Sequence, residues 1–244
     1  MGIVELTRVA PAPQPTAQRR SSLVAYLAAK RLFDVIVSSV ALILLSPVLF
    51  AIAIAIKLDS SGPVIFVQKR VRGDQDPDEI TPERNVFSFF KFRSMHVDSD
   101  PAVHRQFVTQ YINGNCVDTN NGSAKKPLYK LRRDPRITNV GRLLRRTSLD
   151  ELPQLFNVLR GDMSIVGPRP ALPYEVEQYS RAHRERLAVQ AGLTGLWQVS
   201  GRTCLTFDEM IELDLEYCRR RSVALDVRIL AKTLPAILSA NGAW

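Results

Sequence analysis

The sequence predicts a helix-rich α/β fold with small strands, in a monotopic membrane protein that enters the membrane by one proline-kinked, re-entrant helix. An uncharged run of 22 residues, 35–56, is long enough to cross the bilayer core as a helix. Ser46 and Pro47 lie in the middle of that run. Beyond it, the composition is that of a globular domain with short apolar strands and amphipathic helices.

The uncharged run starts too late and is too long for a signal peptide. A single-pass anchor should carry more basic residues on its cytosolic side. Here five basic residues precede the run and four follow it within 20 residues, so neither side is favoured. Pro47 lacks a backbone donor and kinks a helix. A helix that enters and leaves by one face explains both observations, with the single-pass anchor as the alternative.

The overall composition limits the classes of function. The 244 residues are 45% hydrophobic and 23% charged, which excludes a globally disordered chain. A net charge of +9 indicates an anionic partner: nucleic acid, a phosphorylated small molecule or an acidic membrane surface. The three cysteines form no Cys-x-x-Cys pair, so neither a zinc ribbon nor a disulfide framework is expected. This usage fits a reducing, cytosolic location for the folded part.

Periodicity, capping residues and breaks at Gly and Pro predict the order of the elements. We expect a flexible tail at 1–29, the membrane helix at 30–57 and a folded domain at 58–244. Inside the domain we expect strands at 64–67 and 86–92, with a polar loop between them at 74–85. Helices are expected at 102–111, 206–221 and 223–238.

Residues 147–170, TSLDELPQLFNVLRGDMSIVGPRP, are the most informative segment. Ser148 and Glu151 match a capping box, so a helix is expected to begin there and to stop at Gly161. Asp150 is the alternative N-cap, since it would put Pro153 at the third helical position. In either case Asp150 and Glu151 only cap the helix. In the alternative, these adjacent carboxylates are kept ionised by the helix dipole and can hold Mg²⁺. An ionised aspartate is also a nucleophile toward phosphorus.

Basic and aromatic residues flank this carboxylate pair. Seven basic residues against one acidic lie at 130–146, as either a solvated helix face or a contact with phosphates or lipid headgroups. Arg169 stands between two prolines, whose stiff backbone would hold its guanidinium toward a phosphate. The segment 192–202, GLTGLWQVSGR, is either a tight turn around a buried Trp197 or a surface where Trp197 stacks on a base or sugar.

Six stretches carry a resemblance to a known family. They are KRLFD (30–34), Ser46-Pro47, GPVIFVQKRVRG (62–73), FSFFKFRSM (87–95), DPRITNVGRLLRRTSLDELPQLFNVLRGDMSIVGPRP (134–170) and GLTGLWQVSGR (192–202). Together they resemble the bacterial sugar transferases, monotopic phosphoglycosyl transferases that act on polyprenyl phosphates. The resemblance covers about residues 30–244, and the long block around SLDELPQ is its most specific part.

The resemblance implies an enzyme at the bacterial inner membrane with its catalytic domain facing the cytosol. Such an enzyme transfers a sugar-1-phosphate from a UDP-sugar to undecaprenyl phosphate, releases UMP, and initiates an exopolysaccharide or other surface glycan. The pattern favours UDP-glucose or UDP-galactose over N-acetylated sugars. Membrane lipids and downstream glycosyltransferases could be partners, and nucleic acid is not expected. Larger relatives carry further membrane helices upstream, so this chain resembles the minimal catalytic unit.

The resemblance also implies roles for individual residues. Asp150 is the expected nucleophile, Glu151 a base or metal carboxylate, and both would hold Mg²⁺. Ser46 and Pro47 break the re-entrant helix. The residues expected to bind substrate phosphate are Arg169, Arg93, Arg145 and Arg202, and those expected in the nucleotide-sugar pocket are Pro168, Pro170 and Trp197.

Two other classes of protein predict different behaviour. A basic nucleic-acid-binding protein would need no membrane helix, and the chain shows no alternation of aromatic and basic residues. A membrane-anchored adaptor would use Asp150 and Glu151 only as caps and would tolerate Glu151→Gln.

Two segments, 74–85 and 98–130, are longer than expected of the shortest family members. They could shape the sugar pocket or an interface, so the identity of the donor sugar stays open.

Overall fold

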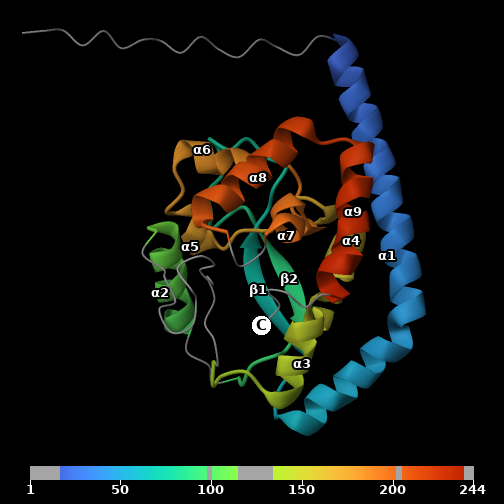
Figure 1. The fold of residues 1–244 in the computed structure, drawn as a ribbon, viewed down its shortest axis with the longest axis vertical. Coiled ribbons are helices and arrows are strands. Elements are labelled where there is room, and N and C mark those ends of the chain that lie inside the picture. Colours follow the sequence, from blue (N-terminus) through green and yellow to red (C-terminus); the bar gives the residue numbers. More distant parts are fainter. Residues whose placement is uncertain (1–16, 98–100, 115–133, 202–204, 239–244) are drawn as a thin grey trace, which may run out of the picture.

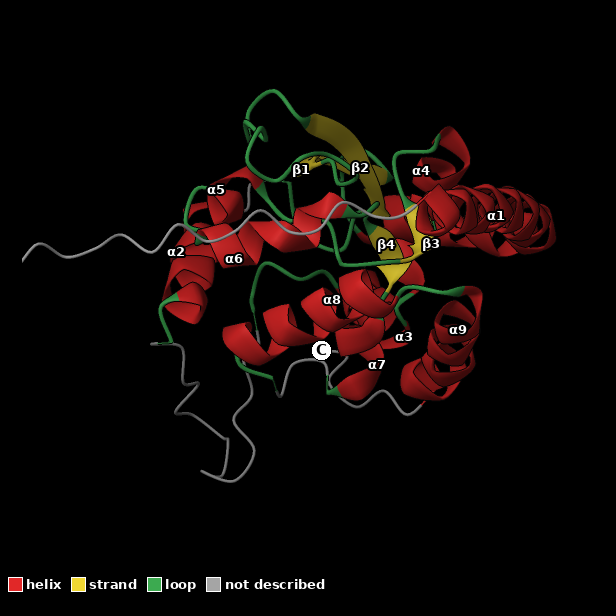
Figure 2. Ribbon diagram, turned by 90° about the horizontal axis from the view of Figure 1, so that it is seen from above, coloured by secondary structure: helices red, strands yellow, loops and turns green. Residues whose placement is uncertain are grey.

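One long helix, α1 (Ala17–Asp59), runs along the side of a helical domain that surrounds two small sheets (Figure 1). This computed structural model describes residues 17–97, 101–114, 134–201 and 205–238. Seen from above (Figure 2), α1 and α4 (Gln154–Arg160) lie beside the smaller sheet, and α8 (Phe207–Arg220) and α9 (Val223–Leu238) lie on another side of it.

The N-terminal helix begins earlier than predicted. Residues 17–29 are helical, although a flexible tail was expected up to residue 29. The reason is local, because no Gly or Pro occurs between Ala17 and Ser46 to interrupt the helix. Residues 1–16 of the predicted tail lie outside the described residues.

Pro47 lies within α1, whose ribbon changes direction in its second half (Figure 1). Proline has no N–H, so the carbonyl four residues before it, that of Ile43, loses its helical donor. The hydroxyl of Ser46 donates to this carbonyl oxygen at 2.8 Å. Ser46 therefore satisfies the group that Pro47 leaves free. Whether this helix is re-entrant in a membrane stays a prediction.

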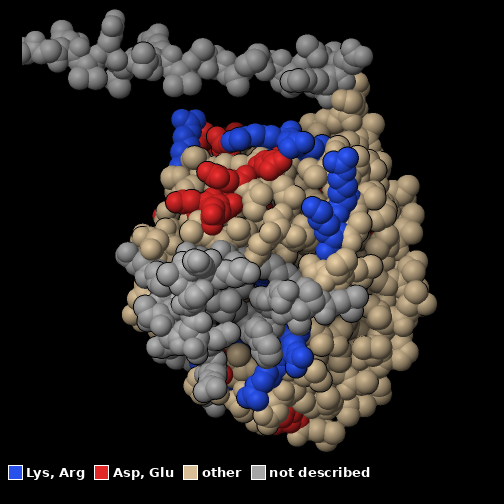
Figure 3. Space-filling model, viewed as in Figure 1, with Lys and Arg blue, Asp and Glu red and all other residues tan. Residues whose placement is uncertain are grey.

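Among the described residues, one helix is long and apolar enough to cross a membrane. It is Ser21–Asp59, whose most apolar window has a mean hydropathy of 2.7 and is only 11% buried. A core helix of that hydropathy would be mostly buried. Figure 3 shows the surface over α1 almost free of charged side chains. Its exposed large apolar residues include Leu32, Ile36, Val40, Ile43, Leu44, Phe50, Ile54 and Leu58.

The larger sheet is an antiparallel hairpin of β1 (Ile65–Val71) and β2 (Val86–Phe92). The second predicted strand is confirmed, and the first continues four residues beyond its predicted end at 67. Arg70 pairs with Phe87, and Phe66 pairs with Lys91. Directly paired residues share one face of a sheet. Phe66 and Arg70 are four residues apart in β1, so they also share a face. The basic side chains of Arg70 and Lys91 therefore stand on the same face.

The smaller sheet was not predicted. Strand β3 (Ser164–Val166) pairs in parallel with β4 (Gly192–Thr194). Each strand has only three residues, too few for a period-of-two pattern to show in the sequence. A Cβ at Gly192 would lie 2.1 Å from the backbone nitrogen of Gly167, so the close approach of these two backbone segments requires glycine.

Helices supply most of the remaining structure. The predicted helices at 206–221 and 223–238 are α8 and α9, and the capping box of α8 forms between Thr206 and Glu209. The helix predicted at 102–111 is α2 (Pro101–Ile112). The other helical elements are α3 (Asn139–Thr147), η1 (Leu149–Glu151), α5 (Pro173–Val176), α6 (Arg181–Arg184), η2 (Glu185–Ala188) and α7 (Leu196–Ser200).

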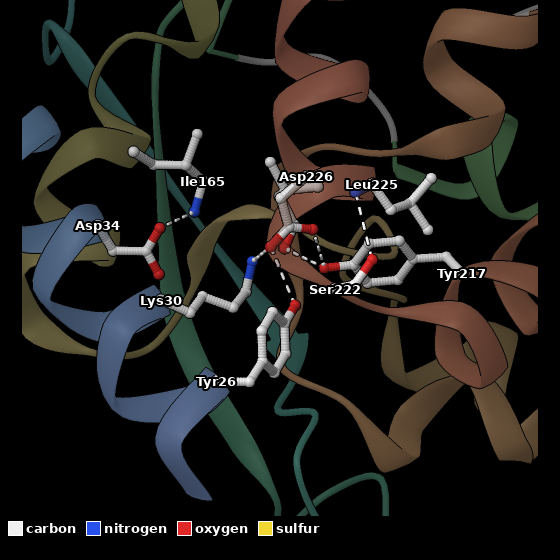
Figure 4. Close-up of polar contacts among 9 residues, drawn as sticks. Tyr26, Lys30, Asp34, Ile165, Tyr217, Ser222, Leu225 and Asp226 are labelled. Carbon is white, nitrogen blue, oxygen red and sulfur yellow. Dashed lines mark hydrogen bonds and ion pairs between the residues drawn. The ribbon is translucent and has the colours of Figure 1, made fainter. Parts of the chain in front are cut away.

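The charged residues of the KRLFD stretch attach α1 to the domain. The Lys30 ammonium lies 2.9 Å from a carboxylate oxygen of Asp226 in α9 (Figure 4). Arg31 donates to the carbonyl oxygens of Val158 and Leu159 at 2.6 and 2.7 Å. These carbonyls end α4, where a positive charge is favourable. Docking of α1 therefore combines an ion pair with the capping of a second helix.

Asp34 and two tyrosines complete this attachment. The buried Asp34 carboxylate accepts a hydrogen bond from the backbone N–H of Ile165 in β3 at 3.0 Å (Figure 4). The hydroxyls of Tyr26 and Tyr217 each donate to Asp226 at 2.9 Å. Asp226 thus accepts from α1 and α8 at once, which joins three helices at one carboxylate.

Candidate active site

A cavity of about 600 Å³ lies over one face of the hairpin, between α2, η1, α7 and α9. Its wall contains both carboxylates of the Asp-Glu pair and five arginines and lysines that the chain brings from distant positions. The polar lining residues central to the site are Arg70, Lys91, Arg145, Asp150, Glu151, Arg169 and Arg186. The fold therefore gathers the predicted dyad and a set of cations around one space.

The Asp-Glu pair lies in a single 3₁₀ turn, η1, rather than at the start of the predicted helix. Ser148 has a left-handed φ of 57°, ends α3, and makes no side-chain capping bond to η1. The predicted capping box at Ser148 is thus wrong. Its backbone N–H is instead directed to the last carbonyls of α3, as in other left-handed helix ends. The predicted stop at Gly161 is confirmed, with φ 82°.

The 3₁₀ geometry decides where each side chain of the turn lies. With three residues per turn, Leu149 and Leu152 fall on the same side. Both pack against the cluster that contains Ile56 of α1 and Phe92 of β2. Asp150 and its neighbour Glu151 consequently lie away from that apolar cluster and line the cavity.

Asp150 is the central carboxylate of the cavity. Its side chain is buried, with 9% relative exposure. Burial and the adjacent Glu151 raise its pKa to about 6, while the positive charges of Lys91, Arg145 and Arg169 act to lower it. The carboxyl is therefore mostly ionised at neutral pH, although it is held out of water. A poorly hydrated carboxylate facing cations is suited to nucleophilic attack on an anionic substrate.

Glu151 and Arg169 form an ion pair, with Oε1 and Nη2 2.8 Å apart. The negative charge of Glu151 raises the pKa of the Arg169 guanidinium, so this arginine stays charged. A guanidinium has five N–H donors, and one carboxylate does not use them all. Glu151 thus orients Arg169 at the edge of the cavity while donors are left for a phosphate.

The backbone around Arg169 is fixed by a ladder of hydrogen bonds to four successive carbonyls. Gly192 N–H donates to the carbonyl of Pro168 at 2.8 Å, and Val71 N–H to that of Ala171 at 2.9 Å. Between them, Arg186 donates to the carbonyl of Arg169 at 3.0 Å, and Arg70 to that of Pro170 at 2.9 Å. Prolines have no N–H, so the carbonyls are the groups by which this turn can be held. The turn is therefore preorganised.

Arg186 is itself held by a buried ion pair with Asp214 of α8, in which the Arg186 side chain is 3% and the Asp214 side chain 0% exposed. It also donates to the hydroxyl of Tyr179 at 2.8 Å. Asp214 lies on the inner face of α8, whereas the partly exposed Glu216 pairs with Arg220. Arg186 positions Arg169 through the backbone.

Two cations of the site, Arg70 and Lys91, were missed by the sequence reasoning. Both come from the shared face of the hairpin, where Arg70 lies 5.2 Å from the ring centroid of Phe89 and Lys91 lies 5.0 Å from that of Phe66. Burial lowers the pKa of Lys91 to about 8 and that of Arg70 to about 10. The sequence did contain a signal for Lys91, namely a lysine on the apolar face of a predicted strand. Lysine is rarely buried unless it is paired with another group.

The other predicted site residues separate into three groups. Arg145, Arg169, Pro170 and Trp197 line the cavity together with the dyad. Pro168 is not in the cavity wall and contributes its carbonyl to the smaller sheet. Arg93 is not there either. Its guanidinium donates to the carbonyls of Ser60 and Pro63 and to the Ser60 hydroxyl, at 2.6 to 2.9 Å.

Arg93 therefore ties the end of α1 to the start of β1, and the prediction that it binds substrate phosphate is corrected by this geometry. Its 4% exposure leaves it no surface for a ligand. The reason is that Arg93 follows β2 directly and points back to the chain that leads from α1 into the hairpin. Arg202, also predicted to bind phosphate, lies outside the described residues.

The cavity has a less polar arm near α7 and α9. Trp197, Leu193, Val199 and Leu230 line it. The indole N–H of Trp197 is buried and has no hydrogen-bond acceptor among the described residues. A buried donor without a partner is unfavourable unless a ligand or water accepts from it. The hydroxyls of Thr194 and Thr233, 2.9 Å apart, connect β4 to α9 on the same wall.

The donor set is compatible with Mg²⁺ only if the substrate supplies ligands. Within the residues that the structure describes, no group of three or more His, Cys, Asp or Glu side chains could hold a metal. Asp150 and Glu151 supply two carboxylates, and Glu151 also pairs with Arg169. Mg²⁺ is commonly held by one or two carboxylates together with phosphates and waters. The two residues fit that arrangement.

Known proteins are similar to this chain over most of its length. Residues 25–240 match the family described as "Bacterial sugar transferase". The chain is 37% identical over 216 residues to the "Exopolysaccharide production protein ExoY" of Rhizobium meliloti (strain 1021), and the match covers 88% of each protein.

Two longer proteins are similar to this chain over part of their length. The chain is 38% identical over 219 residues to "Galactosyl transferase CpsE" of Streptococcus agalactiae serotype III (strain NEM316). It is 40% identical over 213 residues to "UDP-glucose:undecaprenyl-phosphate glucose-1-phosphate transferase" of Escherichia coli (strain K12). The matches include 89% and 84% of this chain but only 44% and 39% of those proteins.

Proposed function

The chain belongs to the bacterial sugar transferase family, and from this premise we propose that it transfers a hexose-1-phosphate from a UDP-sugar to undecaprenyl phosphate. UMP is the second product. The names of these relatives favour glucose or galactose as the hexose and exopolysaccharide synthesis as the purpose. We place the reaction at the inner membrane with the domain facing the cytosol, because α1 is apolar on its outside and UDP-sugars are cytosolic.

The observation that supports this proposal most is the position of Asp150. Its buried carboxylate faces Lys91, Arg145 and Arg169, each of which lowers its pKa electrostatically. A diphosphate bound there would have its charge neutralised by the same cations that face the carboxylate. This arrangement suits an enzyme that uses a carboxylate as nucleophile, and an adaptor protein has no need of it.

In the first step, a carboxylate oxygen of Asp150 attacks the phosphorus that carries the sugar. A new bond forms between that oxygen and phosphorus, and the bond from phosphorus to the bridging oxygen of the diphosphate breaks. UMP leaves with the electron pair of the broken bond. Arg169, held by Glu151 and by its backbone ladder, binds phosphate oxygens and stabilises the developing charge.

In the second step, a phosphate oxygen of undecaprenyl phosphate attacks the same phosphorus. The bond between Asp150 and phosphorus breaks, and the carboxylate is restored. The product is undecaprenyl diphosphate linked to the sugar. Because one carboxylate serves both steps, UMP should leave before the acceptor reacts, which predicts ping-pong kinetics.

We further propose that Mg²⁺ assists this reaction. When bound, the ion would supply positive charge to the phosphates of the donor. Asp150 and Glu151 are the residues that would hold it, in agreement with the two-carboxylate donor set. Removal of divalent cations with EDTA should abolish UMP release, and Mg²⁺ should restore it. Full activity in EDTA would contradict this part of the proposal.

The nucleophile is tested with Asp150→Asn. We expect UMP release to fall at least about 10³-fold, because an amide oxygen cannot form the covalent ester. Wild type incubated with UDP-[³H]glucose or UDP-[³H]galactose, without acceptor, should retain protein-bound label, and the variant should retain none. The matched control is Asp208→Asn, an exposed acidic residue at the start of α8, which should behave as wild type. Covalent labelling or near-normal UMP release in Asp150→Asn would refute the assignment.

A further inference from the structure

A second, smaller cavity lies between α1 and the domain, and it shares no lining residue with the candidate active site. Its volume is about 200 Å³. That is several times the ~30 Å³ that a water molecule occupies in the liquid. Its wall is formed by α1, the end of α8 and two loops, with the residues Tyr26, Leu27, Lys30, Arg31, Asp74, Val189, Gln190, Tyr217 and Arg221.

Three cations from two separate elements converge on this cavity: Lys30, Arg31 and Arg221. Lys30 uses one donor on Asp226, and Arg31 uses two on the carbonyls that end α4. An ammonium has three N–H donors and a guanidinium has five, so both residues retain donors. Their bonds within the protein also hold them in place.

Arg221 differs from the other two cations. It is half-buried, and it has no hydrogen bond or ion pair among the residues that the structure describes. The basic residue beside it, Arg220, pairs with Glu216 and is 70% exposed. Two acidic residues are close by: Asp226 compensates Lys30, and Asp74 is exposed at the cavity wall. The cavity as a whole therefore retains net positive charge.

The cavity also has a defined position along α1. The charged residues Lys30 and Arg31 immediately precede the uncharged run 35–56, whose outer face is exposed and apolar. If that run lies in the hydrocarbon core, the cavity lies at the level of the headgroups. Basic side chains and tyrosines are favoured at that level. Figure 4 shows Tyr26 and Lys30 on the side of α1 that faces Tyr217 and Asp226.

We propose that this cavity binds a phosphate group, with Arg221 as its free donor and Lys30 and Arg31 as fixed supporting charges. The group belongs either to the headgroup of an anionic phospholipid or to a free phosphate. Binding would join α1 to α8 through the ligand, in addition to the existing contacts at Asp226. The site is separate from the transfer reaction, so its binding does not depend on Asp150.

The experiment measures thermal unfolding of the full chain, purified in detergent, with each of three compounds added separately. Phosphatidylglycerol in mixed micelles supplies the lipid source, inorganic phosphate the free source, and diacylglycerol a lipid without phosphate. We expect phosphatidylglycerol, inorganic phosphate or both to raise the melting temperature of wild type, and diacylglycerol to leave it unchanged. The arm that responds identifies the source of the phosphate.

Arg221→Gln should weaken the apparent affinity for the responding compound about tenfold, because a charge-assisted hydrogen bond is lost. Arg220→Gln is the matched control and should respond as wild type. Arg221→Lys should keep most of the response and shows that a loss in Arg221→Gln is not misfolding. Asp150→Asn should also keep it, which separates this site from the proposed catalysis. The proposal would be overturned if neither phosphate compound raised the melting temperature of wild type, or if Arg221→Gln responded as wild type does.

Discussion

At the scale of single residues, the pKa values of the candidate site make a prediction about pH. Asp150 must be ionised to attack, and its pKa is raised to about 6, so activity is lost as pH falls through that value. Lys91 must be protonated to stabilise charge, and its pKa is lowered to about 8, so activity is lost as pH rises through that value. The optimum therefore lies between the two.

The measurement is kcat/KM for the UDP-sugar between pH 4.5 and pH 9.5, values chosen to bracket both groups. We expect a bell-shaped profile in which kcat/KM changes about tenfold per pH unit on each limb. Lys91→Arg should move the alkaline limb upward, since arginine keeps its charge over this range. An alkaline limb that does not move would show that Lys91 is not the group responsible.

A second residue-scale prediction concerns Arg186, which we regard as a positioning residue. Its fork donates to Asp214, to Tyr179 and to the carbonyl of Arg169. Arg186→Lys keeps the charge but cannot make these three contacts from one fork. A displaced Arg169 should lower kcat/KM for the UDP-sugar by roughly 10²-fold, since small misplacements of catalytic groups have effects of that size.

The control for Arg186 is Arg181→Lys, at an arginine that is 86% exposed and paired with Asp78 on the surface. It should leave kcat/KM unchanged. Melting temperatures of both variants accompany the kinetics. If the loss in Arg186→Lys were explained by unfolded protein, or if KM and kcat were both normal, the positioning role would be excluded.

At the scale of elements, the second half of α1 supports the turn that carries the dyad. Ile56 is 2% exposed and belongs to the cluster against which Leu149 and Leu152 pack. Ile56→Ala should leave a cavity and destabilise the protein by about 2–5 kcal/mol. Because the cavity would lie beneath η1, UMP release should decline more than the unfolded fraction explains.

Ile54→Ala is the matched control, since Ile54 lies one half-turn away on the same helix and is 45% exposed. Its removal should change the unfolding free energy in detergent by less than about 1 kcal/mol. Chemical unfolding and UMP release, measured on the same preparations, compare the two variants. Equal effects at positions 54 and 56 would show that α1 does not support the active site.

At the scale of the whole molecule, the topology of α1 decides how the domain meets the membrane. We expect both ends of α1 on the cytosolic side. Single cysteines are introduced as Ser22→Cys and Ser61→Cys after the native cysteines are replaced by serine. A membrane-impermeant maleimide should label both in inverted membrane vesicles and neither in intact spheroplasts. Labelling of the two positions from opposite sides would establish a single-pass helix.

The sequence by itself was sufficient for features that depend on local pattern. The uncharged run 35–56, the helices α8 and α9, strand β2 and the stop at Gly161 follow from composition, capping and periodicity within a few residues. Asp150 and Glu151 were identified from a long specific motif, and the structure places both in the cavity wall. Each of these features is encoded by neighbours in the chain.

Tertiary structure alone decided which distant residues meet. Arg70 and Lys91 reach the dyad because hairpin pairing puts them on one face, and Arg186 reaches Arg169 because α8 supplies a buried Asp214. Arg93 looked like a phosphate ligand in sequence, yet it is bonded to Ser60 and Pro63. The physical reason is that periodicity predicts which face a side chain occupies, whereas the partner on that face depends on how separate elements pack.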